Sequence, residues 1–306
     1  MTDSLDVDVV VPLQGDRSVL RSVIAQLSAL RLTSGGSITI VDNSRRGIGP
    51  LAALPSQMTV LRAGELQSAY FARNRGAARG SAEWLLFLDA DVLPPPDLIE
   101  RYELAKASPN TAILAGGVRD VQAAGAGAEP LASRYCRLRR LIDQQNTLQM
   151  RRPYAKTANC AVRRIAFEHV HGFAERIRSG GDADLCFRLL GAGWQLERRP
   201  AAVVDHQSRA SLRGLLAQRA RHGSGAQWLE ERYPGFVGPP SSMPRVLRRT
   251  CTGAVRAALS LQHGDVDEAI VRMLDPLSNA AYEAGRRIPN APWPKQPESL
   301  RALLAR

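Results

Sequence analysis

The sequence lacks the features that mark membrane-spanning, secreted and zinc-binding proteins. No apolar run approaches the ~20 residues that a membrane-spanning helix needs, and the acidic start MTDSLDVDVVVPL has no basic region typical of a signal peptide. The four cysteines are widely spaced without a CxxC pair, which gives no support to a zinc knuckle and favours reduced, buried thiols. We therefore expect a cytoplasmic protein, with peripheral contact at the inner membrane face as a further expectation.

Lysine is also scarce, although the chain is strongly basic. Only three of the 41 basic residues are lysine, and the net charge is +12. Such a charge favours an anionic partner such as a nucleotide, a nucleic acid or a membrane surface. The skew toward arginine is equally consistent with a genomic composition bias, and aromatic residues make up only 5% of the chain, without an RNP-like aromatic motif. We therefore expect no nucleic-acid partner.

What the sequence does contain is a regular alternation of strand and helix patterns. Apolar, β-branched runs predict buried strands, and apolar residues at helical spacing predict the helices between them. The predicted strands are 7–13, 37–42, 58–63 and 83–89. The first predicted helix begins after Asp16, a plausible N-cap, and the second spans 68–80. This alternation predicts an α/β fold with a mostly parallel central sheet flanked by helices.

The second half of the chain changes character. Residues 134–164 carry nine basic residues against one acid, Asp143. A helix from about residue 182, a strand near 195–204 and a basic helix over 209–232 resume the α/β pattern, and two amphipathic helices are predicted within 245–288. We expect one domain over 1–235, with a donor half at about 1–120 and an acceptor half at about 121–235. Residues 236–306 are expected to form a linker and a small helical C-terminal region.

The sharpest chemical feature is a pair of acids after the fourth predicted strand. Asp89 and Asp91 directly follow Leu85–Leu88. Ligands of doubly wound sheets bind at the carboxyl ends of the strands, and carboxylate oxygens suit Mg²⁺ or Mn²⁺ that also contacts phosphates. The pair favours a divalent cation and a nucleotide, although a solvated acidic turn has the same pattern.

Five ordered motifs extend this observation: VVVPL at 9–13, VDNS at 41–44, ARNRG at 72–76, AEWLLFLDAD at 82–91 and PPD at 95–97. Together they closely resemble the family 2 glycosyltransferases of GT-A fold, over roughly residues 7–235. The resemblance implies a nucleotide-diphosphosugar-binding α/β domain fused to an acceptor-binding half. It also implies the following roles: Pro12 and Asp42 line the base pocket, Arg73 lies near the nucleotide, Asp89 faces the ribose or the metal, and Asp91 binds the metal.

Two further sites follow from the same resemblance. The family usually has Glu-Asp-x-Asp-Leu where this chain has Gly181-Asp182-Ala183-Asp184-Leu185, which makes Asp182 the expected catalytic base and leaves Asp184 a structural or acceptor-binding role. Acids at a helix start also cap the helix and suit its dipole without any catalytic role. His206, after a predicted strand, is the expected second metal ligand.

The expected function is an inverting, metal-dependent glycosyltransferase. It would move a sugar from a nucleotide-diphosphate sugar, for which a UDP-sugar is the leading expectation, to the hydroxyl of a small or lipid-linked acceptor, with Mn²⁺ or Mg²⁺ as cofactor. A dinucleotide oxidoreductase would need G-x-G-x-x-G after the first strand, where this chain has Pro12-Leu13-Gln14-Gly15-Asp16. A sugar-phosphate nucleotidyltransferase would need a glycine-rich basic loop at the same place. The remaining alternatives are a degenerate GT-A scaffold and an arginine-rich nucleic-acid-binding protein, both without catalysis.

Overall fold

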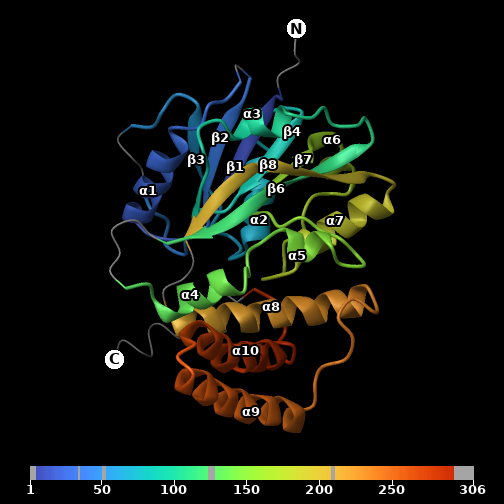
Figure 1. Ribbon diagram of the computed structural model, residues 1–306. Helices are drawn as coiled ribbons and strands as arrows, with labels where there is room; N and C mark the ends of the chain where they lie inside the picture. The colour runs from blue at the N-terminus through green and yellow to red at the C-terminus, as the bar shows by residue number, and fades with distance from the viewer. Residues whose placement is uncertain (1–4, 34, 50–52, 123–127, 208–210, 293–306) are drawn as a thin grey trace, which may run out of the picture.

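The computed structural model describes residues 5–33, 35–49, 53–122, 128–207 and 211–292 (Figure 1). One eight-stranded sheet has the strand order β3-β2-β1-β4-β7-β6-β8-β5. The strands are β1 (Val7–Leu13), β2 (Ser37–Asp42), β3 (Met58–Arg62), β4 (Trp84–Leu88), β5 (Val92–Leu93), β6 (Thr111–Val121), β7 (Asn159–Arg163) and β8 (Gln195–Gln207). The helices are α1 (Arg17–Leu27), α2 (Ala69–Ala77), α3 (Leu98–Glu103), α4 (Leu131–Leu138), α5 (Gln145–Leu148), α6 (Arg164–His169), α7 (Gly181–Gly191), α8 (Leu212–Arg232), α9 (Met243–Gln262) and α10 (Val266–Gly285).

The sheet is mostly parallel. Strands β1 to β4 pair in parallel, and β6 pairs in parallel with β8. Strand β7 runs antiparallel between β4 and β6, and the short β5 runs antiparallel to β8 at the edge. The carboxyl ends of β1, β2 and β4 therefore meet at one edge, which is where the sequence places its acidic clusters.

Helices cover both faces of the sheet. Alternate residues of β1 enter opposite cores, because successive side chains of a strand point to opposite faces. Val9 and Val11 pack with α1 and α3, whereas Val10 packs with α2, α6 and α7. Gly76 allows α2 to approach closely, since a Cβ there would lie 2.5 Å from Val10 and 2.9 Å from Val41. This contact fixes α2 beneath the carboxyl ends of β1 and β2.

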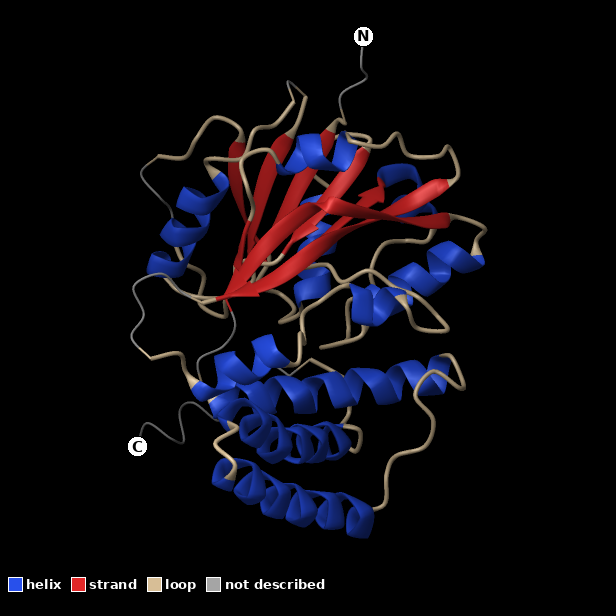
Figure 2. Ribbon diagram, in the orientation of Figure 1, coloured by secondary structure: helices blue, strands red, loops and turns tan. Residues whose placement is uncertain are grey.

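A second group of helices lies beyond the carboxyl edge of the sheet (Figure 2). Tyr135 and Cys136 of α4, Leu215 of α8, and Ile270 and Leu274 of α10 share a small apolar core. Helix α9 packs against α10 and is the outermost element in this view. The boundary at residue 235 stays a prediction: α8, which precedes it, packs against α10, which follows it.

The α/β fold with a mainly parallel sheet, predicted from the sequence, is confirmed. Asp16 caps α1 as expected, accepting hydrogen bonds from the backbone of Ser18 and Val19 at 2.8 and 3.1 Å. The sequence did not predict β6 or β7. Strand β6 contains Gly116 and Gly117, which weaken a strand pattern. None of the helices in the described residues has both the length and the hydropathy needed to cross a membrane.

Candidate active site

Asp42 ends β2 at the carboxyl edge and organises the loop that follows it. Its side chain is buried, and its two oxygens accept hydrogen bonds from the backbone N–H groups of Ser44 (2.9 Å) and Ile48 (2.8 Å). Arg62 of β3 lies 3.5 Å from the same carboxylate. Pro12 of β1 is half-buried and pairs in register with Val41. Asp42 therefore holds the loop next to the expected base pocket, a role that is separate from any direct contact with a base.

The rest of the VDNS motif ties neighbouring loops together. Asn43 is buried and donates to the carbonyl oxygens of Ala63 and, at 2.8 Å, Leu66. The Ser44 hydroxyl accepts a hydrogen bond from the Gly15 N–H and donates one to the Gly15 carbonyl, each at 3.0 Å. The loops after β1, β2 and β3 are thus held as one unit at the sheet edge.

Arg73 and Asp89 form an ion pair at the end of β4. The Arg73 side chain is 5% exposed and reaches Asp89 from α2, while its guanidinium lies over the Tyr70 and Phe173 rings at 5.6 and 6.0 Å from their centroids. Burial raises the pKa of Asp89, Arg73 opposes that rise, and the charges of Asp91 and Asp182 add to it. The buried Nε of Arg73 has no hydrogen-bond partner among the described residues, and an incoming anion could supply one.

Asp91 faces His206 across the β5–β8 pair. The His206 Nε2 lies 3.5 Å from an oxygen of Asp91, and its Nδ1 lies 2.8 Å from Asp120 of β6. Burial alone would lower the pKa of His206, but the hydrogen bonds and charges of Asp120 and Asp91 outweigh it and raise the pKa to about 9. The structure thus brings together the two expected metal ligands and adds Asp120, which holds the imidazole.

The donor set suits a divalent cation only in part. Within the described residues, no three His, Cys, Asp or Glu side chains are arranged to hold a metal ion by themselves. An imidazole fixed by a carboxylate on its other nitrogen is a common arrangement for a metal-binding histidine. Mg²⁺ and Mn²⁺ often take one or two protein carboxylates plus substrate phosphates. Asp91 and His206 therefore fit a cation that would arrive with the nucleotide and displace the proton from the imidazole.

Asp182, the expected base, begins the first turn of α7 and is half-buried. One of its oxygens accepts a hydrogen bond from the Tyr70 hydroxyl at 2.9 Å, and the other lies 3.3 Å from the Thr157 backbone nitrogen. A Cβ on Gly181 would lie 2.5 Å from the Tyr70 ring. The ring therefore occupies the space that a glutamate at position 181 would need.

Asp184 has a structural position. It is fully buried and accepts hydrogen bonds from Arg188 (2.9 Å) and the Tyr233 hydroxyl (2.8 Å), with Arg232 at 3.1 Å. All of these contacts join α7 to itself and to the end of α8. The two acids of the Asp-x-Asp pattern are thus clearly different: Asp182 faces the cluster of carboxylates, and Asp184 faces the core.

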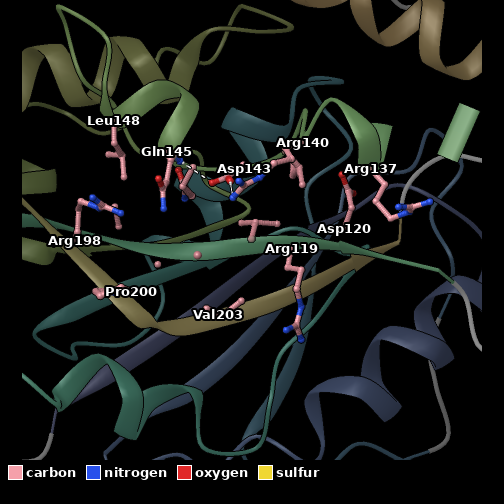
Figure 3. Close-up of a pocket in the computed structure, with 16 residues that line it drawn as sticks. Arg119, Asp120, Arg137, Arg140, Asp143, Gln145, Leu148, Arg198, Pro200 and Val203 are labelled. Carbon is pink, nitrogen blue, oxygen red and sulfur yellow. Dashed lines mark hydrogen bonds and ion pairs between the residues drawn. The ribbon is translucent and has the colours of Figure 1, made fainter. Parts of the chain in front are cut away.

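A pocket of about 340 Å³ adjoins this cluster, between β6, β8 and the segment from α4 to α5 (Figure 3). Asp120 lines it and also contacts His206, so the pocket leads to the Asp91–His206 pair. Arg137 and Arg140 line it as well, paired with Glu129 and Asp143 respectively. Arg140 has a φ of +48°, which is uncommon for a residue with a side chain and is often seen near functional sites.

Comparison with known proteins identifies the family. The model of "Glycosyltransferase like family 2" matches residues 6–225. The chain belongs to glycosyltransferase family 2. This confirms the resemblance drawn from the sequence motifs and assigns the chain to the glycosyltransferases.

Two curated relatives are glycosyltransferases from a bacterium and an archaeon. The pre-mycofactocin glycosyltransferase of Mycobacterium tuberculosis is 30% identical over 241 residues, covering 76% of this chain and 49% of the relative. Glycosyltransferase AglE of Haloferax volcanii is 28% identical over 278 residues, covering 82% and 88% of the two chains. This chain thus spans about half the length of the mycobacterial relative.

Solved structures share the fold at low sequence identity. The mannosyltransferase PcManGT of Pyrobaculum calidifontis, in complex with GDP-Man and Mn²⁺, superposes with a TM-score of 0.58 at 16% identity, over 91% of this chain and 86% of that one. GalNAc-T7 with UDP, GalNAc and Mn²⁺ gives 0.52 at 13% identity, over 90% and 55%. Both likenesses concern the fold.

Two residues of this cluster, Asp120 and Tyr70, were not predicted from the sequence. Asp120 lies on β6, a strand that the pattern did not reveal. Tyr70 could have been found, because it precedes Arg73 by three residues in a predicted helix, and residues at that spacing share a helix face. The roles of the predicted residues remain predictions.

The position of Asp42 predicts a local effect of its removal. Asp42→Ala leaves the N–H groups of Ser44 and Ile48 without their acceptor, so we expect faster hydrogen–deuterium exchange in peptides covering 43–49. Nucleotide affinity should fall as well, by roughly 10–150-fold if a base donates to this carboxylate. Asp16→Ala is the control, because it removes a carboxylate that likewise accepts hydrogen bonds from two backbone N–H groups, those of Ser18 and Val19 at the start of α1. Unchanged exchange over 43–49 in Asp42→Ala would contradict the loop-organising role.

Proposed function

We propose that the chain is an inverting, metal-dependent glycosyltransferase that uses a nucleotide-diphosphate sugar. The observation that carries this proposal is the cluster of Asp89, Asp91 and Asp182 at the carboxyl edge of the sheet, where the charges of the other two act on Asp89. A concentration of carboxylates that could supply both a ligand for a cation and a base for the acceptor suits transfer from a diphosphate donor.

The donor would lie over the loops after β1, β2 and β4. Asp42 and Pro12 border the base, and Arg73 offers a buried guanidinium next to Asp89. Asp89 and two aromatic rings hold the Arg73 guanidinium in one position. It is therefore preorganised to bind an anion. A UDP-sugar remains the proposed donor; the similar solved structures hold GDP-Man in one case and UDP in the other.

Asp91 and His206 would hold Mn²⁺ or Mg²⁺ in this site. The cation, when bound, stabilises the negative charge that develops on the leaving diphosphate. Asp120 fixes the imidazole ring so that Nε2 faces Asp91.

Asp182 would accept the proton of the acceptor hydroxyl. The acceptor oxygen forms a bond to the anomeric carbon while the bond from that carbon to the diphosphate oxygen breaks, and the nucleoside diphosphate leaves with the electron pair. Tyr70 and Thr157 hold the carboxylate in place from two sides. A single displacement with one base inverts the configuration at the anomeric carbon.

The pocket beside Asp120 would receive the acceptor. It shares Asp120 with the Asp91–His206 pair and is bordered by Arg137 and Arg140, for which an acidic group of the acceptor would compete with Glu129 and Asp143. Arg139, between them in sequence, instead pairs with Asp275 of α10 at 3.0 Å. The arginines of 134–140 are thus divided between the pocket and the helical layer.

The direct test is a donor screen. Hydrolysis or transfer is measured with UDP-, GDP- and dTDP-sugars in the presence of Mn²⁺ or Mg²⁺, with nucleotide binding followed separately. One donor class turned over with metal supports the proposal. Binding of oligonucleotide without any nucleotide-sugar turnover would favour the non-catalytic alternative.

Metal removal gives the next prediction. EDTA should abolish turnover and Mn²⁺ or Mg²⁺ should restore it, whereas Asp91→Ala should lose both turnover and metal-dependent nucleotide binding. The matched control is Asp97→Ala, an acid nearby in sequence that pairs with Arg101. Full turnover in EDTA, or equal losses in the two variants, would show that Asp91 does not hold the cation.

The base is tested by separating binding from chemistry. Asp182→Asn keeps the shape of the side chain, so nucleotide and metal should bind as in the parent, while kcat falls by roughly 10²-fold or more. Asp184→Asn should instead lower the melting temperature, because its buried partners lose a charged acceptor. If Asp182→Asn retains most of its turnover, Asp182 is a helix cap and not the base.

The acceptor pocket is tested with its arginines. Arg137→Gln with Arg140→Gln should leave donor affinity unchanged and raise the acceptor KM by roughly two- to tenfold, an effect that shrinks as salt rises. Arg139→Gln is the control, since its side chain faces α10. Loss of donor binding in the double variant would overturn the division into donor and acceptor sides.

A further inference from the structure

Helix α9 is unusual in its charge. Its 20 residues include Arg245, Arg248, Arg249 and Arg256 and no acidic residue. Within the part of the chain that the structure describes, none of these four arginines takes part in an ion pair. The helix therefore presents four positive charges that no described acid neutralises.

Acids on the neighbouring helix α10 are engaged elsewhere. Asp267 pairs with Arg134 of α4, Glu268 pairs with Arg272 of its own helix, and Asp275 pairs with Arg139. These contacts point the acidic side of α10 toward α4 or along α10. None of these three acids neutralises an arginine of α9.

The outward face of α9 is also apolar. Leu247, Val255 and Leu259 are 65%, 62% and 49% exposed. With the exposed Cys251 they recur every four residues, which places them along one side of the helix. Arg245, Arg249 and Arg256 recur at intervals of four and seven and form a second stripe, on the flank between the apolar stripe and the face buried against α10.

Packing fixes which face of α9 is outermost. Val246, Gly253, Ala257 and Ser260 are buried. A Cβ on Gly253 would lie 2.4 Å from Pro276, so α9 and α10 are in close contact there. Helix α9 cannot roll to bury its aliphatic stripe without losing this contact, and it lies at the far side of the helical layer from the sheet (Figure 1).

We propose that the outer face of α9 binds the surface of an anionic lipid membrane. Basic amphipathic helices lie in the membrane interface with aliphatic side chains among the acyl chains and arginines at the lipid phosphates. The side-by-side aliphatic and basic stripes of α9 provide both contacts. This inference does not depend on the proposed catalytic activity.

Two other occupants fit the surface less well. A second copy packed through the same face would bring two sets of four unpaired arginines together, which like-charge repulsion opposes. A nucleic acid would contact the arginines but would leave the aliphatic stripe exposed, and α9 has no aromatic side chain on which bases could stack. An anionic bilayer satisfies both stripes.

The test is flotation of the full chain with vesicles. We expect binding to vesicles of phosphatidylcholine containing phosphatidylglycerol, little binding to phosphatidylcholine alone, and weakening as salt rises. Arg249→Gln with Arg256→Gln should weaken binding by roughly 30-fold, at about fivefold for each arginine near an anionic surface. Arg21→Gln with Arg79→Gln removes the same charge from exposed arginines of the sheet domain and should have a much smaller effect.

The apolar stripe is tested in the same way. Leu247→Ser with Val255→Ser should weaken binding by roughly tenfold or more. Leu104→Ser with Ile165→Ser, which alters exposed apolar residues of the sheet domain, is the control and should bind as the parent. Melting temperatures of all variants are measured, so that loss of fold is recognised.

Four results would overturn the proposal. The first is the absence of binding to anionic vesicles, and the second is an equal loss in the α9 variants and their controls. The third is a dimer in solution that Leu247→Ser with Val255→Ser converts to monomer, which would assign the face to a second copy. Binding to an oligonucleotide that depends on the arginines but not on the aliphatic stripe would assign it to nucleic acid.

Discussion

The candidate site depends on one turn of helix α2. Tyr70 and Arg73 lie three residues apart and hold two different carboxylates, Asp182 of α7 and Asp89, which follows β4. The aromatic ring and the guanidinium also stack on each other, at 5.6 Å from guanidinium carbon to ring centroid. A single rigid element thus sets the relative position of the expected base and the donor-side acid.

Helix α2 can do this because it is itself fixed from several sides. Its N-cap Ser68 donates to the Ile177 carbonyl at 3.0 Å, and Asn74 donates to the Phe173 carbonyl at 2.9 Å. Gly76 lets the helix lie directly against β1 and β2. Helix α2 therefore fixes the relative positions of segments that are far apart in the sequence. Such fixed geometry is the preorganisation that group transfer needs.

The sequence pattern predicted the strands and the acids that follow them, but not the side-chain contacts that join these acids to other elements. The strands around Asp42 and Asp89 were predicted because buried parallel strands are apolar throughout, and the acids that follow them stand out. Asp120 was not predicted as a site residue because β6 contains a glycine pair and few apolar residues at its end. Tyr70 and Gly181 complement each other across the fold, and no local pattern shows that one ring fills the space of an absent side chain.

We propose above all that the carboxyl edge of the sheet binds a nucleotide and a divalent cation, the cation through Asp91 and His206 and the nucleotide beside Asp42 and Arg73. The most direct measurement is a crystal structure with UDP and Mn²⁺ bound, using the anomalous signal of manganese to locate the cation. The account predicts an anomalous peak in contact with Asp91 and the Nε2 of His206, with the diphosphate beside it and the base near the Asp42 loop. A cation and nucleotide bound away from both Asp91 and Asp42 would contradict it.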